Sequence, residues 1–293
     1  MVFVDKELAI RLETAEADLT RQYVDAYYAL YRDAGAGSVE VCGGRVSFAG
    51  RSSPLSKADA VGLVGEVKAA DLDFIEDYLV IRGARPTLVA CPFTDRSLFS
   101  LAGQRGYEID QFLNLYILPL PHNDGAQAQS AQGAPTQASP VEDGGHPARE
   151  PGKIGVKALP TGDRETYRDT WSVVVGLGFA SMDAGSPPYM DIYRSIAHAS
   201  GTISFLATVG GEPAGAGALK ITGNTAFLST ASTLPQYRRQ GVQMALMKTR
   251  LAEAVRQGCD LAVVMTSPGA DSERNVVRAG FRLAYTRIRL VKR

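Results

Sequence analysis

The sequence predicts an α/β protein with a mixed sheet in each of two consecutive domains. Strand-like and helix-like runs alternate along the carboxy-terminal half, a similar order of runs closes the amino-terminal half, and a segment poor in large apolar side chains lies between them. Short apolar runs that alternate with helical periodicity are typical of sheets covered by helices. We therefore expect two tandem domains of similar architecture, at 1–120 and 153–293.

The segment 121–152, between the two expected domains, has the composition of a flexible linker. Val141 is its only large aliphatic side chain, and Gly, Ala, Gln, Ser and Pro dominate the rest. Such a segment cannot bury enough apolar surface to offset the entropy that ordering would cost. We predict that it joins the domains without a fold of its own.

The carboxy-terminal half is expected to contain a strand, two helices, a three-strand meander, a loop leading into a helix, and then a strand, a helix and a strand. Alternating and continuous apolar runs indicate the strands, whereas apolar spacings of three and four indicate the helices. Turns at 210–213 and 223–224 join the strands of the meander. The expected strands cover 154–159, 203–209, 214–221, 225–234, 261–265 and 281–291, and the expected helices cover 163–178, 187–199, a stretch ending near 257, and 271–279.

The end of the amino-terminal half repeats this closing pattern. The apolar run 87–92, a short helix, a Gly-aromatic pair and a last strand to Leu118 follow the same order as 261–291. Such self-similarity indicates a repeat at the scale of a domain. The counterpart of the basic loop described below should fall at 64–68, where the arginines and the second small residue are missing. We therefore expect a degenerate copy with a scaffolding or substrate-gating role.

Formal charge is zero overall but unevenly distributed. Residues 1–120 hold 12 Lys and Arg against 17 Asp and Glu, 121–152 hold 1 against 4, and 153–293 hold 18 against 10, giving −5, −3 and +8. A basic half indicates an anionic partner. Nucleic acid is disfavoured as that partner, because the arginines are scattered over several elements without an aromatic and basic platform.

Membrane, disulfide and metal classes are also disfavoured. No apolar run approaches the roughly 20 residues that a membrane-spanning helix needs, and Asp5 and Lys6 stand where a signal peptide would place apolar residues. Cys42, Cys91 and Cys259 lie far apart without CxxC spacing, which indicates buried free thiols rather than a disulfide framework or a zinc site. We expect a cytoplasmic protein without a metal.

One segment, 234–246, carries a pattern that indicates chemistry. Arg238 and Arg239 stand at the start of a helix, where unpaired N–H groups and the helix dipole favour acidic neighbours instead. The arrangement is favourable if an anion shares the site, and Gly241 would let the backbone close around it. A pyrophosphate would accept the amides of 241–244. The alternative is a solvated basic turn before an amphipathic helix.

These residues resemble the GNAT superfamily of N-acetyltransferases. The segments TLPQYRRQGVQMAL, SERN and AGFRLAYT match its pattern over about 153–293, and 1–120 resembles the degenerate partner of tandem GNAT proteins. The resemblance implies acetyl-CoA as co-substrate, with its pantetheine arm along the strand near Thr233, where a backbone N–H can polarise the thioester carbonyl. The cofactor-binding residues that it implies are Thr233, Arg238, Arg239, Gln240, Gly241, Val242, Gln243, Met244 and Asn275. For Asn275, a polar position on the helix surface is the alternative.

Two positions depart from the family pattern. Gln243 stands where a small residue is usual, and Val276 stands where many members place the tyrosine that protonates the leaving thiolate. A thiolate is a tolerable leaving group, because the pKa of a free thiol is about 8.5. Tyr285 and Ser272 are the candidate replacements for the missing acid, with Tyr237 a weaker one because it is expected to pack under the loop.

The acceptor side is less patterned. Asp183 and Asp191 flank the segment 185–188, and either carboxylate could attract a cationic amine or take its proton, with helix capping as the alternative. His198 is expected to be exposed. We expect a small-molecule primary amine rather than a protein as acceptor, and a monomer or weak homodimer.

Two functions remain open at this point. The first is acetyl transfer to an amine by direct attack in a ternary complex, without a covalent intermediate. The second is a non-catalytic acyl-CoA-binding sensor, which the missing tyrosine and the lack of a histidine base favour. Nucleic-acid binding is a weaker third.

Overall fold

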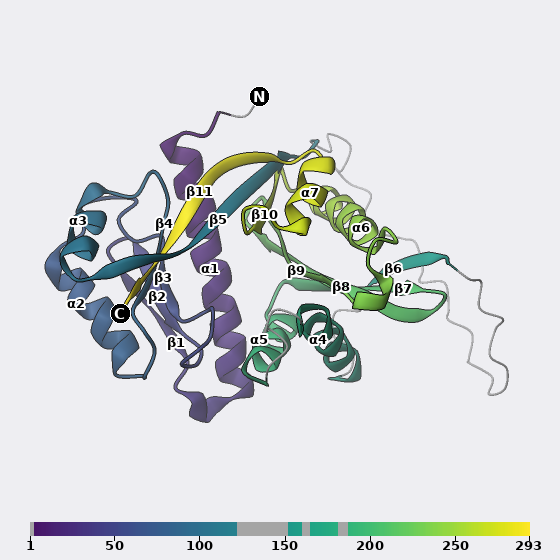
Figure 1. Ribbon diagram of the computed structural model, residues 1–293, viewed down its shortest axis with the longest axis horizontal. Coiled ribbons are helices and arrows are strands. Elements are labelled where there is room, and N and C mark those ends of the chain that lie inside the picture. The colour runs from purple at the N-terminus through teal and green to yellow at the C-terminus, as the bar shows by residue number, and fades with distance from the viewer. Residues whose placement is uncertain (1–2, 122–151, 160–164, 181–186) are drawn as a thin grey trace.

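Eleven strands form one continuous mixed sheet with helices packed on both faces, in a computed structural model that describes residues 3–121, 152–159, 165–180 and 187–293 (Figure 1). Of the segment expected to be a linker, 121–152, only the first and last residues lie within these ranges. The candidate Asp183 lies outside them. The strands are β1 (Gly37–Val41), β2 (Gly44–Phe48), β3 (Lys57–Asp59), β4 (Thr87–Ala90), β5 (Tyr107–Pro119), β6 (Ile154–Ala158), β7 (Thr202–Val209), β8 (Glu212–Thr222), β9 (Thr225–Thr233), β10 (Leu261–Thr266) and β11 (Arg282–Lys292). The helices are α1 (Lys6–Leu30), η1 (Arg32–Ala34), α2 (Ala69–Val80), α3 (Arg96–Gln104), α4 (Glu165–Phe179), α5 (Pro187–His198), η3 (Pro235–Tyr237), α6 (Val242–Arg256) and α7 (Asp271–Arg278).

The two halves of the chain exchange their last strands. The strand order is β1-β2-β3-β4-β11-β5-β10-β9-β8-β7-β6. The carboxy-terminal strand β11 therefore pairs with β4 of the amino-terminal half, and β5 pairs with β10 of the carboxy-terminal half. The exchanged strands also pair with each other, antiparallel, from Arg282↔Ile117 to Lys292↔Tyr107. Each half thus completes its part of the sheet with a strand from the other.

The order of elements follows the expected repeat. In the amino-terminal half α2 connects the parallel strands β3 and β4, and α3 leads to β5. In the other half α6 connects the parallel strands β9 and β10, and α7 leads to β11. The mixed α/β fold class is confirmed, and element bounds agree to within a few residues: the strand expected at 225–234 is β9, and the helix expected at 271–279 is α7.

Helix α1 lies in the angle between the two halves (Figure 1). It begins after Asp5, whose Oδ1 accepts a hydrogen bond from the amide of Leu8 at 2.8 Å, the usual capping arrangement. The helix packs against β1, β2 and β3 on one side and against α5 and β8 on the other. Arg11 reaches Asp260, just before β10, in an ion pair. One helix of the amino-terminal half therefore contacts both parts of the sheet.

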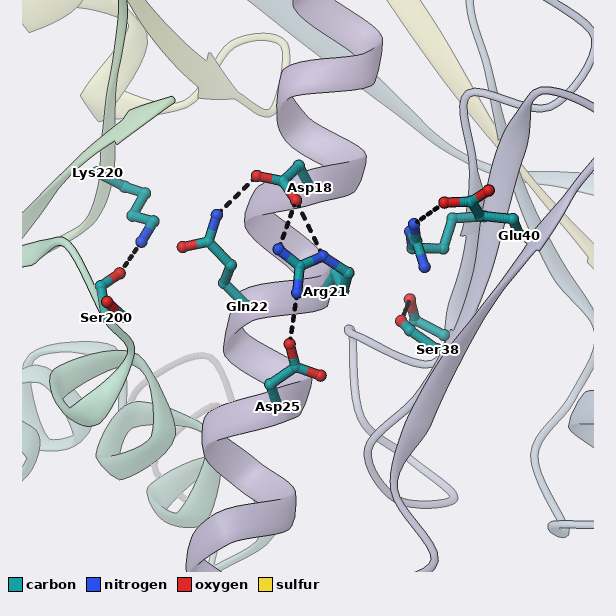
Figure 2. A network of polar contacts seen from close by, with 10 residues as sticks. Asp18, Arg21, Gln22, Asp25, Ser38, Glu40, Ser200 and Lys220 are labelled. Atoms are coloured by element: carbon teal, nitrogen blue, oxygen red, sulfur yellow. Dashed lines mark hydrogen bonds and ion pairs between the residues drawn. The ribbon is translucent and has the colours of Figure 1, made fainter. Parts of the chain in front are cut away.

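Polar side chains continue along α1 where it passes between the halves (Figure 2). Arg21 donates to Asp18 at 2.9 Å and to Asp25 at 2.6 Å, and Gln22 also donates to Asp18 at 2.6 Å. On the facing strand β8, the buried ammonium of Lys220 donates to the carbonyl of Ser200. Burial lowers the pKa of Lys220. This part of the interface between the halves is thus polar and internally bonded.

A buried ionic cluster joins α1 to the exchanged strand β11. Arg287 of β11 donates to Glu13 at 2.7 Å and also to Glu16, and all three side chains are almost completely buried. On β3, Lys57 lies 3.7 Å from Glu16 and 2.8 Å from Asp59. Burial opposes the charged form of Glu16, but the attraction and hydrogen bonds of Arg287 and Lys57 together outweigh it and lower the pKa of that carboxyl. The cluster therefore ties the two halves together through largely buried charge pairs.

In the described part of the chain, no helix has both the length and the apolar character needed to cross a membrane. The three cysteines are free; Cys91 and Cys259 are buried and Cys42 is half-buried. No group of three or more candidate metal ligands occurs among the placed residues.

Candidate functional site

The ladder between β9 and β10 ends in the middle of β9. The parallel pairs run from Leu261↔Thr225 to Val263↔Phe227, although β9 continues to Thr233. Beyond this point β10 remains paired with β5, so the side of β9 that faced β10 has no strand partner from 228 to 233. We call residues 228–233 the open edge of β9. An interior strand with an open edge can pair with an extended ligand through its main chain.

Two threonines at this end of the strands have unpaired hydroxyls. The Oγ1 atoms of Thr233 on β9 and Thr266 on β10 are buried and have no hydrogen-bond partner among the described residues. Buried polar atoms normally have a hydrogen-bond partner. Two hydroxyls without one are compatible with a polar ligand that binds beside them. Thr233 is one of the residues that the sequence predicted for the cofactor.

The loop after β9 leads into α6 without a capping side chain. Gly241 is the N-cap residue at φ 91°, in the left-handed region that glycine adopts without strain. The first intrahelical bond runs from the amide of Ala245 to the Gly241 carbonyl at 3.0 Å. The amides of Val242, Gln243 and Met244 therefore point out of the helix start, where an anion can accept them. The side chain of Val242 is buried in the core, so only its main chain faces this site.

The two arginines of the loop have different environments. Arg238 donates from Nη2 to the carbonyl of Gly178 at 3.0 Å and from Nε to that of Thr233 at 3.4 Å, so it ties the loop to the end of α4. Arg239 is exposed and has φ 62°, and its guanidinium forms no hydrogen bond or ion pair with any described residue. Gln240 is also exposed, and donates to the carbonyl of Gln236 at 3.0 Å. Arg239 is thus the arginine of the loop whose guanidinium is not engaged by a described residue.

Gln243 and Asn275 lie together beside this helix start. The Nδ2 atom of Asn275 on α7 donates to Oε1 of Gln243 at 2.6 Å, and both side chains are half-buried. The side chain of Gln243, at a position where the family pattern has a small residue, therefore extends towards α7. The structure brings these two predicted cofactor residues into direct contact.

Of the three predicted catalytic residues, the structure describes Tyr285 and Ser272, which have different surroundings. Tyr285 lies on β11, which β5 and β10 separate from β9, and its hydroxyl donates to Glu13 at 2.7 Å within the buried cluster. Burial, and then the charge of Glu13, raise the pKa of Tyr285. Ser272 is half-buried in the first turn of α7, and Asp183 lies outside the described residues. We therefore assign no proton-transfer role to Tyr285, because its hydroxyl is engaged in the core.

Nearby positions discussed at the sequence level also have defined surroundings. Val276, at the position of the family tyrosine, is buried in the core beside α6. Tyr237 is half-buried against apolar residues, as expected. Asp191 lies 3.7 Å from Arg194 in an ion pair, and His198 is half-buried rather than exposed, with Nδ1 2.8 Å from the Arg194 carbonyl.

The amino-terminal half contributes side chains that sequence reasoning missed. The hydroxyl of Tyr23 on α1 lies 3.2 Å from Oγ of Ser229, two residues beyond the last pair of β9 with β10. Burial raises the pKa of Tyr23 to about 12. No local signal in the sequence marks Tyr23, because its place depends on how α1 packs between the halves.

Residues of the exchanged strand β5 hold α7 in position. Glu273 of α7 accepts hydrogen bonds from Nδ2 of Asn114 at 2.7 Å and from the hydroxyl of Tyr116 at 2.8 Å. It also accepts from the amide of Gly269 at 2.7 Å. These bonds lower the pKa of the Glu273 carboxyl. The helix that carries Asn275 is therefore fixed by a strand of the other half.

The corresponding helix start in the amino-terminal half is closed by its own residues. The amide of Lys68 donates to the Asp71 carboxylate at 2.8 Å, and the amide of Val67 donates to the Ser97 hydroxyl at 2.8 Å. An acidic side chain thus occupies the position where an anion would bind at α6. The ionic cluster fills the region beside β3, where the pairing with β4 is limited to Ala58↔Leu88.

Comparison with known proteins gives a family match over part of the chain. Residues 167–281 match the model of the acetyltransferase (GNAT) family. No match was found among curated proteins.

Solved structures resemble the whole fold at low sequence identity. A GCN5-related N-acetyltransferase from Kribbella flavida superposes with a TM-score of 0.59 at 17% identity, covering 97% of this chain and 95% of that one. A tandem GNAT protein from the clavulanic acid biosynthesis pathway gives 0.54 at 15% identity, over 85% and 77% of the two chains. A conserved protein of unknown function from Staphylococcus epidermidis gives 0.52 at 10% identity, over 91% and 96%. These likenesses concern the fold.

Proposed function

We propose, from the match of residues 167–281 to the acetyltransferase (GNAT) family model, that the protein transfers an acetyl group from acetyl-CoA to a primary amine. The acceptor in this proposal is a small molecule, and the amine attacks the thioester directly in a ternary complex. The observation that carries the proposal is the start of α6, which has an αL glycine and an exposed arginine but no capping side chain. At the equivalent start of α2, the carboxylate of Asp71 accepts a hydrogen bond from the main chain, whereas no side chain does so at the start of α6.

The residues around the open edge of β9 suit acetyl-CoA. The amides of Val242 to Met244 and the guanidinium of Arg239 would hold the pyrophosphate. The main chain of the open edge would pair with the amide groups of the pantetheine arm, near the unpaired hydroxyls of Thr233 and Thr266. The Gln243–Asn275 pair would border the cofactor at the junction of α6 and α7. Acetyl-CoA supplies an acyl group that is activated as a thioester.

In the proposed reaction a C–N bond forms and the C–S bond breaks. The neutral amine attacks the thioester carbon, the thiolate leaves with the electron pair of the C–S bond, and the nitrogen loses one proton to water or a basic side chain. Alignment of the two substrates and main-chain donors on β9 would supply most of the rate. A dedicated acid is not essential, because a thiol with a pKa of about 8.5 can leave as the thiolate near neutral pH.

A thiol-release assay with acetyl-CoA and a panel of small amines tests the proposal. We expect at least one amine to stimulate CoA release, and the Arg239→Ala, Gly241→Ala double variant to lose both release and CoA binding while remaining folded. Arg256→Ala is the matched control, because Arg256 is an exposed arginine at the other end of α6. CoA binding by the double variant as tight as that of the parent would contradict the assigned site.

A non-catalytic acyl-CoA sensor is the second candidate function. It is favoured by the burial of Val276 at the position of the family acid and by the engagement of the Tyr285 hydroxyl in the core. The sensor hypothesis predicts that acetyl-CoA raises the melting temperature while no amine causes thiol release. Turnover with any acceptor excludes it.

A further inference from the structure

The strand β9 contains a bulge at the open edge. Ala218 pairs with Ser229 and Ala216 with Ser232, so Gly217 of β8 faces both Thr230 and Ala231. Thr230 has φ 51°, a left-handed conformation that a β-branched residue adopts only when its surroundings impose it. A bulge of this kind bends the strand and redirects its main-chain groups. Something in the fold must therefore hold this segment in place.

Two large buried side chains bind the carbonyls at the bulge, one from each face of the sheet. The indole Nε1 of Trp171 on α4 donates to the Gly217 carbonyl at 3.2 Å. The Nη1 atom of Arg250 on α6 donates to the carbonyls of Ala218 and Ser229 at 3.1 and 3.2 Å. The helices α4 and α6 lie on opposite sides of β8 and β9 (Figure 1). The bulge is thus clamped between an indole and a guanidinium.

Arg250 has surroundings that stability alone does not explain. It is 1% exposed, and no carboxylate lies within ion-pair distance of it among the described residues. Burial lowers the pKa of Arg250 to about 10. A buried cation without a counter-charge costs more than an apolar side chain of the same size. Its Nε donates to the Leu246 carbonyl of its own helix at 3.2 Å, which aims the remaining donors at the bulge.

Gly217 is matched to this arrangement. A Cβ atom at Gly217 would lie 3.1 Å from Cζ of Arg250, closer than the guanidinium can comfortably accommodate. The glycine therefore lets the guanidinium approach closely enough to reach the carbonyls of Ala218 and Ser229, the cross-strand pair on one flank of the bulge. Glycine, arginine, tryptophan and the strained threonine form one unit around the same few main-chain groups.

We propose that Arg250 and Trp171 are positioning residues for acyl transfer, which hold the β9 bulge so that the open edge presents its N–H groups to the acyl carbonyl. This inference rests on the proposed function, because it concerns the strand along which the thioester would lie. Neither side chain touches the reacting atoms. Both act through the conformation of Ser229, Thr230 and Ala231.

The infrared carbonyl stretch of bound acetyl-CoA, labelled with ¹³C at the acetyl carbonyl, tests this role without knowledge of the acceptor. In the parent protein we expect the band at lower frequency than in solution, because a positioned N–H polarises the carbonyl. In Arg250→Met the band should return towards its solution position, and turnover in the thiol-release assay should fall by roughly 10- to 100-fold. Affinity for CoA, which lacks the acyl group, should change by less than about threefold, since the start of α6 is untouched.

Further variants separate positioning from a general loss of structure. Arg250→Lys can still donate to Ala218 and Ser229 and should restore part of the band shift. Trp171→Phe removes the indole N–H together with part of the ring volume, keeps an aromatic ring in the core and should displace the band less, which provides a second test if Arg250→Met does not fold. Arg256→Met, an exposed change on the same helix, is the control and should leave band and turnover unchanged.

The possible outcomes are distinct. A parent protein that does not bind acetyl-CoA overturns the proposed function and this inference with it. Binding with an unshifted carbonyl band, or a shifted band that persists in folded Arg250→Met and Trp171→Phe, overturns the positioning role alone. In that case Arg250 and Trp171 would serve only the stability of the sheet.

Discussion

Asn275 donates a hydrogen bond of 2.6 Å to Gln243, and this contact links the helix after β10 to the uncapped start of α6. We predict that Gln243→Ala and Asn275→Ala each weaken CoA binding by about three- to tenfold, as expected when one hydrogen bond worth about 1 kcal/mol loses its partner. The double variant should bind no more weakly than the worse single variant, because both changes remove the same contact. Isothermal titration calorimetry measures all four affinities. Fully additive losses would show that the two side chains act independently.

Replacement of Arg239 should affect stability and binding in opposite directions. Arg239 has φ 62°, so Arg239→Gly relieves a left-handed conformation and should raise the free energy of unfolding by about 1 kcal/mol. The same change removes a cation and should weaken CoA binding about tenfold. Arg239→Ala is the matched comparison, since it loses the charge but keeps the strain. Urea denaturation and calorimetry measure the two effects; equal stability of the Gly and Ala variants would argue against strain at this position.

One CoA should bind per chain. The start of α2 is already satisfied by Asp71 and Ser97, whereas the start of α6 has no capping side chain. Calorimetric titration is expected to give a stoichiometry of 1, and the Arg239→Ala, Gly241→Ala variant should leave no residual site. A second binding event that survives in this variant would assign cofactor binding to the amino-terminal half.

Acid should weaken the attachment of α7 to β5. The pKa of Glu273 is lowered from its ordinary value of 4.5 by hydrogen bonds from Asn114, Tyr116 and the amide of Gly269. A carboxyl whose pKa is lower in the folded state stabilises fully above the unfolded value, and this contribution is lost as the pH falls through the folded value. The melting temperature of the parent should therefore exceed that of Glu273→Gln at pH 7, and the gap should narrow below pH 4.5. The exposed change Asp271→Asn serves as control; a gap that stays constant with pH would show that the charge of Glu273 is not involved.

Tyr285→Phe should affect folding rather than chemistry. The Tyr285 hydroxyl donates to Glu13 in the buried cluster, and its loss should lower the free energy of unfolding by roughly 1–3 kcal/mol. Turnover per folded molecule should remain within about twofold of the parent, since nothing at the open edge of β9 changes. A large fall in turnover with unchanged stability would instead give Tyr285 the acid role that the sequence suggested.

The sequence predicted those features that depend on neighbours in the chain. The bounds of β9 and α7 follow from apolar periodicity and turns, and the basic loop at Gly241 follows from residue types that conflict with a helix start unless an anion is present. The sequence also predicted both Gln243 and Asn275 at the cofactor site, and the structure shows these two side chains in contact.

Features that depend on packing between distant segments could not be predicted. The exchange of β5 and β11 is a choice between two similar closing strands, and neither contains a residue that marks its partner. In the sequence alone, the hydroxyl of Tyr285 is a candidate proton donor. In the structure α1 places Glu13 beside it, and the hydroxyl donates to that carboxylate. Arg250 resembles any charged residue on an amphipathic helix, and only the bulge opposite Gly217 gives it carbonyls to bind.

The strand exchange has a consequence for how the chain is made. On the ribosome, β4 emerges long before β11, so the amino-terminal half must wait for residues 282–292 before its sheet is closed. Until then β4 presents a bare edge to other nascent chains, a state in which aggregation and chaperone capture compete with folding. Deletion of β11 would accordingly leave both halves of the sheet incomplete, the first half to be translated as well as the second.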